Sequence, residues 1–350
     1  MKVGYKASAE QFGARELLEF ALLAEESGFD SVTVSDHFQP WRHHGGQAPN
    51  AFAWLGALAA RSKRVQLGTS VATPTFRYHP ALVAQMAATI QSLAGGRFFL
   101  GIGTGESMNE VPLGIEWPEI KVRFARMKEA VELMRKLWTE DFVTFDGDFY
   151  KTKNATIYEK TQSGPVPIYI AGTGESAARL AGRVADGFIC TSGKGEELYT
   201  TTLIPAVHEG AKKAGRDPSA IEMMIEVKVS YDTDRTRALE NTREWAALAL
   251  SGDQKVGVED PREMERLAST LTAEQAASRW IVSTDPAEIA ERVGAYADMG
   301  FDHLVVHGPG ADQERFITLF AKDVLPGLRA RASRAAAALT SARSTAPSPT

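Results

Sequence analysis

The sequence predicts an α/β protein built as a single (β/α)8 TIM barrel. Three observations lead to this fold class. Short β-branched or apolar segments alternate with helix-length amphipathic segments along the whole chain. Several of these short segments are apolar throughout, as parallel strands covered on both faces are. No break in composition divides the 350 residues into two domains. The alternative, an open doubly wound sheet, would place a Gly-x-Gly-x-x-Gly turn after the first strand, and none is present.

Eight strands are predicted from short β-branched and apolar runs. In chain order they are Lys2–Lys6, Ser31–Ser35, Val65–Val71, Phe98–Ile102, Ile168–Ala171, Gly187–Thr191, Met224–Ser230 and His303–His307. The predicted helices between and after them are Ala14–Ser27, Ala51–Ser62, Pro80–Leu93, Glu119–Leu137, Glu175–Arg183, Glu196–Ala214, Arg235–Leu250, Pro286–Met299 and Asp312–Val324.

Two segments exceed the minimal barrel. Residues 142–150 alternate apolar and polar side chains around an Asp-Gly pair, which predicts a β-hairpin. Residues 232–279, between the seventh and eighth strands, are too many for an ordinary connection, and they predict an insertion with its own helices at the C-terminal face. The barrel domain is therefore expected to cover residues 1–328. Residues 329–350 form an Ala/Ser/Pro-rich tail whose start can extend the last helix and whose end is expected to be disordered.

Composition excludes several classes of protein. The formal net charge of −5 argues against a general nucleic-acid-binding surface. No apolar run approaches the roughly 18–20 residues of a membrane span, and the first residues lack the apolar stretch of a secretory signal, so we expect a cytoplasmic protein. The single cysteine, Cys190, excludes a disulfide framework and a Cys-x-x-Cys metal site, and no metal is expected.

The second predicted strand ends in an Asp-His pair, Asp36-His37, with Trp41 four residues further on. Functional residues of such barrels follow the C-terminal ends of strands. Histidine is the side chain best suited to accept a proton near neutral pH, and a neighbouring carboxylate stabilises the imidazolium. The alternative is that Asp36 caps a turn and His37 only hydrogen-bonds the backbone.

The fourth strand leads into Gly103-Thr104-Gly105-Glu106. The glycines allow a flat or anionic group to approach the backbone N–H groups. In a closed site the Glu106 carboxyl would have a raised pKa and act as a proton donor. The alternative is that Glu106 only begins the next helix.

The fifth and sixth strands precede two possible anion sites. The turn Gly172-Thr173-Gly174 opens a helix, and the backbone amides of a helix N-terminus suit a cofactor phosphate. Lys194 lies among glycines and hydroxyl groups, as in a phosphate pocket, although a solvated surface lysine is the alternative. Lys255 and Arg279, in the insertion, are uninformative by themselves.

Taken together, these strand ends closely resemble the coenzyme F420-dependent glucose-6-phosphate dehydrogenases. The resemblance is carried by Gly4 to Phe12, Thr33 to Arg42, Leu67 to Tyr78, Gly103 to Glu106 and Asp186 to Tyr199. It runs from Met1 to about Leu328 and places the chain in the luciferase-like superfamily of (β/α)8 barrels. It implies a homodimer that uses coenzyme F420, an 8-hydroxy-5-deazaflavin. The implied reaction oxidises glucose 6-phosphate to 6-phosphogluconolactone, with hydride transfer from sugar C1 to deazaflavin C5.

The resemblance also implies roles for individual residues. His37 is similar to the base for the C1 hydroxyl, Trp41 to the indole on the reacting centre, and Glu106 to the acid for the reduced ring. The implied cofactor contacts are Asp36, Ser70, Val71, Thr73, Thr104, Gly105, Asn109, Thr173, Gly174, Ser176 and Ala177, with a cis peptide bond at Ser70-Val71. The implied phosphate pocket consists of Thr191, Lys194, Lys255 and Arg279.

Three other functions remain open at this point. An F420-dependent dehydrogenase could accept other sugar 6-phosphates or another alcohol. An FMN-dependent luciferase-like monooxygenase would need no substrate phosphate, and the three cations would then be incidental. A non-catalytic barrel that carries a flavin-like ligand would not require His37 or Glu106.

Overall fold

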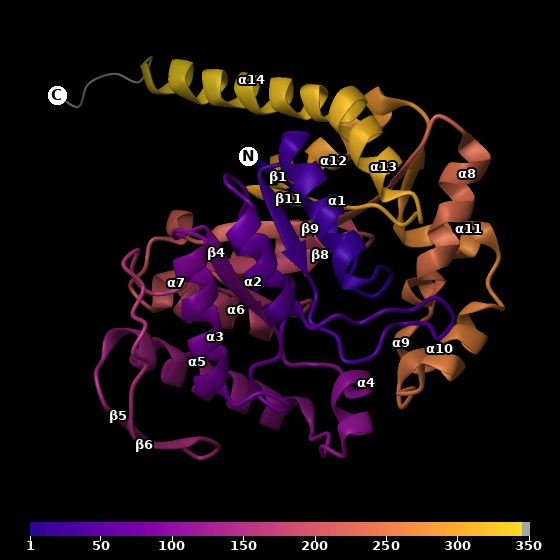
Figure 1. Cartoon of the computed structure of the whole chain (residues 1–350). Helices are drawn as coiled ribbons and strands as arrows, with labels where there is room; N and C mark the ends of the chain where they lie inside the picture. Colours follow the sequence, from indigo (N-terminus) through magenta and orange to yellow (C-terminus); the bar gives the residue numbers. More distant parts are fainter. Residues whose placement is uncertain (345–350) are drawn as a thin grey trace.

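The computed structural model describes residues 1–344, with the side chains of residues 1–334, and it confirms the predicted closed barrel (Figure 1). Eight parallel strands pair in chain order, and pairing of the last barrel strand with the first closes the ring. Each of the eight predicted strands is a strand of this barrel. Their bounds are β1 (Lys2–Ala7), β2 (Ser31–Val34), β3 (Gln66–Thr69), β4 (Phe98–Ile102), β7 (Ile168–Ala171), β8 (Gly187–Thr191), β9 (Glu222–Tyr231) and β11 (His303–His307).

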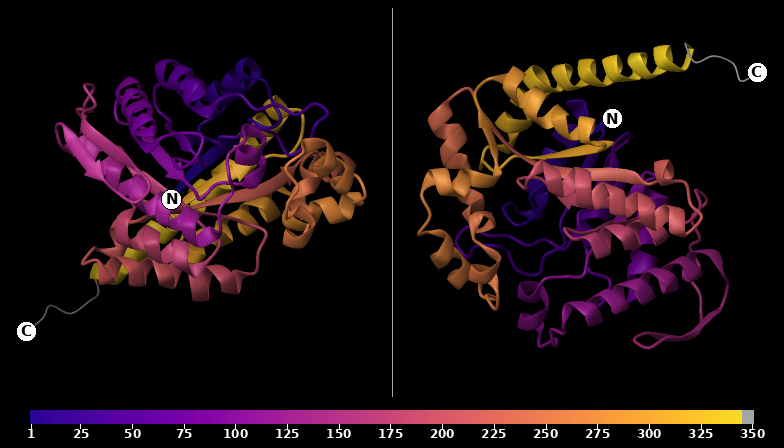
Figure 2. Two further views of the ribbon diagram at one scale, coloured as in Figure 1. Left: turned by 90° about the horizontal axis from the view of Figure 1, so that it is seen from below. Right: turned by 180° about the vertical axis from the view of Figure 1, so that it is seen from behind.

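Helices surround the barrel on its outside (Figure 2). Several begin at N-cap residues that accept a backbone N–H group. Asn50 accepts the N–H of Ala53, and Asp285, which directly precedes Pro286, accepts the N–H of Ala287. The bounds of these outer helices are α1 (Ala14–Glu26), α2 (Ala51–Arg61), α3 (Pro80–Leu93), α5 (Ile120–Thr139), α6 (Glu175–Val184), α7 (Ile204–Lys213), α12 (Pro286–Met299), α13 (Gln313–Leu319) and α14 (Leu325–Ser344). Single turns of 3-10 or π geometry are Val111–Leu113, Leu198–Leu203, Pro218–Ala220, Ala277–Arg279 and Phe320–Val324.

The interior of the barrel is filled by a small apolar cluster of its own. It consists of Phe99, Tyr169, Ile189, Met224 and Val305, which come from five different strands. The rings of Phe99 and Tyr169 stack with centroids 4.5 Å apart. Interior layers of this kind make the barrel a packed core, so a ligand can be held only at its mouth.

A charged network closes the N-terminal end of the barrel. Glu222 accepts hydrogen bonds from Lys2 (2.6 Å) and Tyr169 (2.9 Å), and it pairs with His303 Nδ1 at 2.7 Å. His303 Nε2 lies 2.6 Å from the hydroxyl of Ser31. Burial raises the pKa of Glu222, but His303 and Lys2 outweigh it and lower this pKa to about 2. The carboxylate is therefore ionised at neutral pH and ties four strands together, namely β1, β7, β9 and β11.

The predicted hairpin is present, but its turn is longer than the Asp-Gly pair suggests. The strands are β5 (Val143–Asp146) and β6 (Lys151–Ala155). Residues 147–150 form the turn because the Glu129 carboxylate accepts the backbone N–H groups of Asp148, Phe149 and Tyr150. The second strand therefore begins only at Lys151, later than the Asp-Gly pair predicts. The cause is a carboxylate on α5, a contact that the local sequence does not reveal.

The insertion between β9 and β11 forms a layer of short helices on one side of the barrel, orange in Figure 1. The predicted helix over Arg235–Leu250 is wrong in its second half, because a 3-10 segment (Asn241–Ala249) replaces it and kinks at Trp245. The Trp245 indole is buried and donates to Gln11 Oε1 at 3.0 Å, which holds this kink. The helices here are α8 (Arg235–Glu240), α9 (Gly252–Lys255), α10 (Pro261–Ala268) and α11 (Ala273–Ala276).

Two further features lie after the insertion. The strand β10 (Ile281–Ser283), which the sequence reading missed, pairs with β9 outside the barrel ring and has only three residues. The final helix α14 continues through Leu328 to Ser344, so the Ala-rich start of the predicted tail does extend the last helix. The end of that tail, residues 345–350, lies outside the described residues. Within residues 1–344, no helix is long and apolar enough to cross a membrane.

Candidate active site

A cavity of about 990 Å³ opens at the C-terminal ends of the barrel strands. The predicted site residues lie far apart in the sequence, yet all of them except Lys194 and Lys255 line this one cavity. They are Asp36, His37, Trp41, Ser70, Val71, Thr73, Thr104, Gly105, Glu106, Asn109, Thr173, Gly174, Ser176, Ala177, Thr191 and Arg279. Closure of the barrel brings them together, since all the strand ends meet at its rim.

The imidazole of His37 contacts a backbone carbonyl and a side-chain amide on one side and faces carboxylates on the other. Nδ1 lies 3.2 Å from the carbonyl oxygen of Gln39, and Asn109 Nδ2 lies 3.3 Å from the same nitrogen. We assign a proton to Nδ1, which then donates to the Gln39 carbonyl oxygen, because that contact is the shorter one and a carbonyl oxygen can only accept. Asn109 Oδ1 accepts the N–H of Phe38 at 2.8 Å and thereby fixes the loop after His37. Nε2 is then left free to accept a proton.

The carboxylate beside this nitrogen is Glu10, which follows β1 and was missed by the sequence reading. Glu10 Oε1 lies 3.3 Å from His37 Nε2 and accepts from the Ser35 hydroxyl at 2.6 Å. Burial raises the pKa of Glu10, but His37, Lys6 and the Ser35 hydrogen bond together hold it below its usual value. Glu10 is therefore ionised at neutral pH and stabilises a positive charge on the imidazole.

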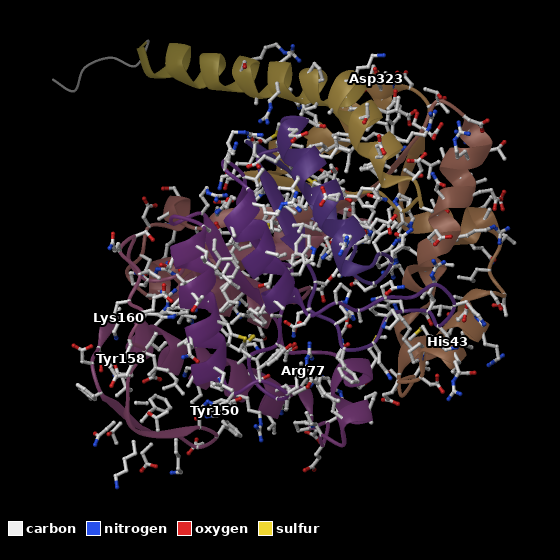
Figure 3. All side chains as sticks on the ribbon, in the orientation of Figure 1. His43, Arg77, Tyr150, Tyr158, Lys160 and Asp323 are labelled. Atoms are coloured by element: carbon white, nitrogen blue, oxygen red, sulfur yellow. The ribbon has the colours of Figure 1, made fainter. Side chains whose placement is uncertain are left out.

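Asp36 does not serve as the carboxylate partner of His37, contrary to the expectation from the Asp-His pair. Its carboxylate binds Arg77 Nη2 at 2.7 Å, and its backbone oxygen accepts from the same guanidinium at 2.7 Å. Arg77, labelled in Figure 3, also pairs with Glu110. All three side chains are buried, and burial raises the pKa of Glu110 even though Arg77 opposes this. The triad anchors the loop after β2 to the loop after β3.

Replacing Arg77 by Met is expected to lower the free energy of unfolding by roughly 3–5 kcal/mol, because two buried carboxylates then lose their counter-charge. Urea denaturation followed by circular dichroism measures this change. The control is Arg61→Met, which removes an exposed pair with Glu19 and is expected to change stability by less than about 1 kcal/mol. Equal effects of the two substitutions would show that the triad contributes no more than a surface ion pair.

Glu106 and Trp41 complete the surroundings of His37. Glu106 Oε2 lies 3.9 Å from His37 Nε2, and the Glu106 side chain is 47% exposed. It occupies the N-cap position of the short helix α4 (Ser107–Glu110) but makes no side-chain capping bond there, so its carboxyl is not used by the helix. The indole of Trp41 lies 6.0 Å from the imidazole, centroid to centroid. Both side chains line the same cavity as His37.

The opposite wall fits a flat ring joined to an anionic group. A Cβ on Gly105 (φ 84°) would lie only 3.0 Å from Thr73 Cγ2, so this approach of two loops needs glycine. A Cβ on Gly174 would meet no atom within 4 Å, and no side chain caps the N-terminus of α6 that begins there. The first backbone N–H groups of α6 are therefore available to an anion. The Ser70-Val71 peptide bond is cis, as the resemblance implies, and Lys6 Nζ donates to the Ser70 carbonyl at 2.8 Å.

Lys194 and Lys255 do not line the cavity wall, but they surround Arg279, which does. Burial lowers the pKa of Lys194, and the charge of Arg279 lowers it further; the same two causes lower the pKa of Lys255. A Cβ on Gly193 would lie 2.8 Å from the carbonyl oxygen of Arg279, so the Lys194 loop packs directly on Arg279. Lys255 Nζ lies 5.8 Å from the centre of the Trp41 ring. The structure thus gathers the three cations into one electropositive corner.

Four further polar side chains line the floor of the cavity and were not singled out from the sequence. They are Lys6, Glu226, Lys228 and His307, each located on a barrel strand. A signal for two of them exists, since Glu226 and Lys228 are charged residues two positions apart in the middle of a mostly apolar strand and therefore share a face. Charged residues on a buried face need a partner, so this spacing points to a binding site.

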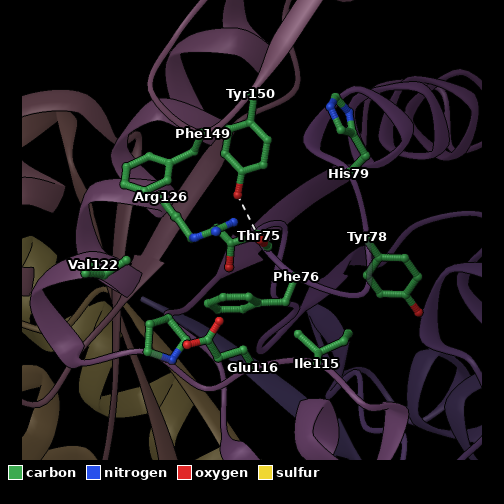
Figure 4. A pocket seen from close by; sticks show the side chains of 11 residues that line it. Thr75, Phe76, Tyr78, His79, Ile115, Glu116, Val122, Arg126, Phe149 and Tyr150 are labelled. Carbon is green, nitrogen blue, oxygen red and sulfur yellow. Dashed lines mark hydrogen bonds between the residues drawn. The ribbon is translucent and has the colours of Figure 1, made fainter.

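A second cavity, of about 510 Å³, lies between the hairpin and the loop after β3, and residues of both line it (Figure 4). Tyr150 donates to the backbone oxygen of Thr75 at 2.8 Å, and the Arg126 guanidinium lies over the rings of Phe76 (5.3 Å) and Phe149 (4.9 Å). Because Tyr150 binds a backbone carbonyl and the Arg126 guanidinium covers two aromatic rings, we interpret this cavity as structural. In the part of the chain covered by the structure, no three His, Cys, Asp or Glu side chains are arranged to hold a metal ion.

Comparison with known proteins gives consistent results. The family model described as luciferase-like monooxygenase matches residues 1–303. The chain is 60% identical over 330 residues to a protein of Nakamurella multipartita named F420-dependent glucose-6-phosphate dehydrogenase, covering 94% of this chain and 97% of that one. It is 59% identical over 331 residues to the protein of the same name from Mycolicibacterium smegmatis, with 94% and 98% covered.

Two solved structures have the same fold. An F420-dependent secondary alcohol dehydrogenase in complex with an F420-acetone adduct superposes with a TM-score of 0.87 at 36% identity, covering 93% of this chain and 98% of the other. The coenzyme F420-dependent tetrahydromethanopterin reductase of Methanopyrus kandleri gives a TM-score of 0.78 at 20% identity, covering 93% and 99%, which shows the fold alone.

Proposed function

Since the chain belongs to the luciferase-like monooxygenase family, and within it to the F420-dependent glucose-6-phosphate dehydrogenases, we propose that it oxidises glucose 6-phosphate with coenzyme F420. The products are 6-phosphogluconolactone and reduced F420. The observation that carries the proposal is the arrangement of the cavity: a proton acceptor between two carboxyl groups, a glycine-lined wall and a corner of three cations.

His37 is the base in this proposal. Its Nε2 accepts the proton of the sugar C1 hydroxyl, while the Nδ1 contact to Gln39 fixes the ring orientation. The positive charge that forms on the imidazole is stabilised by the Glu10 carboxylate at 3.3 Å. Trp41 lies beside the reacting centre, and the Glu106 carboxyl, 3.9 Å from Nε2, would be the proton donor toward the cofactor ring.

The cation corner anchors the substrate at the end remote from C1. Arg279 can engage a phosphate through two parallel N–H donors, and Lys194 and Lys255 add two more positive charges beside it. Thr191 lines the cavity next to this corner. Binding energy from the phosphate positions C1 against His37, and this raises the rate as well as the affinity.

The residues present fit coenzyme F420. Gly105, Thr73 and the Ser70-Val71 bulge would hold the ring, and the free N–H groups of Ser176 and Ala177 at the start of α6 would hold the phosphate, next to Thr173 and Gly174. Asp36, Thr104 and Asn109 line the cavity between them. When bound, the deazaflavin supplies the hydride acceptor.

The cation corner also separates this function from the alternatives. A dehydrogenase of simple alcohols or an FMN-dependent monooxygenase needs no substrate phosphate, whereas three cations at the substrate end of the site suit any hexose 6-phosphate. Broader sugar 6-phosphate specificity is therefore the alternative that the geometry favours most. A ligand carrier would not need His37 Nε2 to be left free beside Glu10.

The test mixes the purified protein with oxidised F420 and glucose 6-phosphate and follows the visible absorbance of the cofactor. Loss of absorbance at saturating substrate supports the dehydrogenase. Glucose without phosphate is the matched substrate control and should show a kcat/KM lower by at least about 10²-fold. Cofactor binding without turnover would favour the carrier, and turnover with FMN but not F420 would favour the monooxygenase.

The quaternary structure and location are also part of the proposal. We expect a homodimer, as in the resembling family, which light scattering coupled to size-exclusion chromatography would test. We expect the protein in the cytoplasm because hexose 6-phosphates are charged metabolites that do not cross membranes freely. Cell fractionation would test this.

A further inference from the structure

The floor of the cavity carries charged side chains between His37 and the cation corner. Lys6 Nζ lies 3.4 Å from Glu226 Oε2, and His307 Nδ1 lies 3.4 Å from Glu226 Oε1. Lys228 is two residues further along β9 on the same face. Burial lowers its pKa, the charge of Glu226 raises it, and the charges of Arg279 and Lys194 lower it further. The reacting end and the phosphate end of the site are therefore joined by Lys6, Glu226 and Lys228, which we call the polar band.

Lys228 is the member of this band that lacks a partner in the protein. Its residue is only 4% exposed, and it lines the cavity. Among the side chains that the structure describes, none pairs with Lys228 Nζ within 4 Å or accepts a hydrogen bond from it, although its backbone N–H donates to Ser192 Oγ. Burial of an ammonium group without a partner is costly, and it also lowers the pKa of Lys228. A ligand atom that accepts a hydrogen bond would remove this cost.

Glu226, two residues before Lys228 on the same strand, supplies a hydrogen-bond acceptor to the same part of the cavity. Burial raises its pKa, but Lys6, His307 and Lys228 hold it far below the usual value, so Glu226 is ionised. An ionised carboxylate can only accept hydrogen bonds, and an ammonium group can only donate them. A sugar hydroxyl does both, so neighbouring hydroxyls match this pair. A phosphate dianion does not match it, because Glu226 repels it.

We propose that Glu226 and Lys228 form a hydroxyl-recognition subsite that reads the sugar hydroxyls between C1 and the phosphate and selects among hexose 6-phosphates. This inference rests on the proposed function and adds the residues that set its specificity. Trp245 and Leu248 line the same cavity and offer an apolar surface to the sugar ring. The cations hold the phosphate, His37 faces C1, and the pair on β9 recognises the hydroxyls in between.

The experiment compares kcat/KM for glucose 6-phosphate with kcat/KM for its 2-deoxy and 3-deoxy analogues. The wild-type enzyme should discriminate against at least one analogue by about tenfold or more, because a missing hydroxyl leaves buried charges unpaired. Lys228→Met and Glu226→Gln should each reduce that discrimination to about threefold or less. Lys63→Met, at an exposed position beyond α2, is the matched control and should keep the wild-type ratio.

Inorganic phosphate, used as a competitive inhibitor, separates hydroxyl recognition from phosphate binding. Its inhibition constant should change by less than about twofold in Lys228→Met. An increase of tenfold or more would make Lys228 a phosphate ligand and overturn the proposal.

Discrimination between the analogues that survives in both variants would overturn the proposal too. Absence of turnover in the wild type would instead refute the proposed function. For a variant without turnover, calorimetric binding of the same sugar phosphates, after fluorescence has confirmed F420 binding, gives the discrimination ratio directly.

Discussion

Replacing His37 by Ala is expected to lower kcat by about 10²–10⁴-fold while the Kd of F420 changes by less than about threefold. The reason is geometric: Nε2 of His37 is the free ring nitrogen at the cavity, and Glu10 is placed to stabilise its charge. The imidazole contacts the Gln39 carbonyl oxygen of its own loop and the Asn109 amide, which is only one of the eleven proposed cofactor contacts, so most of the affinity for F420 should persist. Stopped-flow turnover and fluorescence titration of F420 measure the two quantities separately.

The matched control for this prediction is His43→Ala. His43 follows in the same loop but is exposed and does not line the cavity, so kcat should be unchanged. The pH profile provides a second readout, because the acidic limb of kcat/KM set by the base should disappear in His37→Ala. Unchanged turnover in this variant would remove His37 as the base.

Replacing Arg279 by Met is expected to raise the KM for glucose 6-phosphate by roughly 10–100-fold, as expected for loss of charge-assisted hydrogen bonds to a phosphate. Arg279 is the cation that lines the cavity itself, and Lys194 and Lys255 are gathered around it. The wall that fits the cofactor lies on the loops after β3, β4 and β7, so the Kd of F420 should stay within about threefold. Steady-state kinetics at saturating F420 gives the KM.

Arg262→Met is the control within the same insertion. Arg262 is exposed and pairs with Asp260 on its own helix end, so neither KM nor the Kd of F420 should respond. Unphosphorylated glucose offers a second check, since its low kcat/KM should be the same with and without Arg279. If Arg279→Met weakened the binding of sugar phosphate and of cofactor equally, the assignment of this corner to the substrate would be contradicted.

Most residues that line the cavity could be predicted from the sequence, because strand ends are local signals. His37, Glu106 and the Thr173-Gly174 turn each follow a recognisable apolar strand, and closure of a barrel places all such ends at one rim. The ion-pair partner of a side chain could not be predicted where that partner lies far away in the sequence. Glu10, 27 residues before His37, is the carboxylate beside the imidazole, whereas the adjacent Asp36 is bound to Arg77.

The kink at Trp245 shows the same limit within the insertion. Local periodicity predicted a continuous helix over Arg235–Leu250, but the indole donates to Gln11, more than two hundred residues earlier, and its ring packs edge-on against His307. Helix propensity amounts to only a few tenths of a kcal/mol per residue, so burial of one indole can outweigh it.

The barrel, its strand ends and the residue types at its mouth could all be predicted from the amino-acid sequence, because apolar periodicity and glycine placement are properties of short segments. Which charges meet became clear only from the folded chain: Glu10 lies beside His37, Arg77 binds Asp36, and Lys6 pairs with Glu226. The physical reason is that electrostatic pairing depends on distance in space, and distance between residues on different strands is set by barrel closure rather than by separation along the chain.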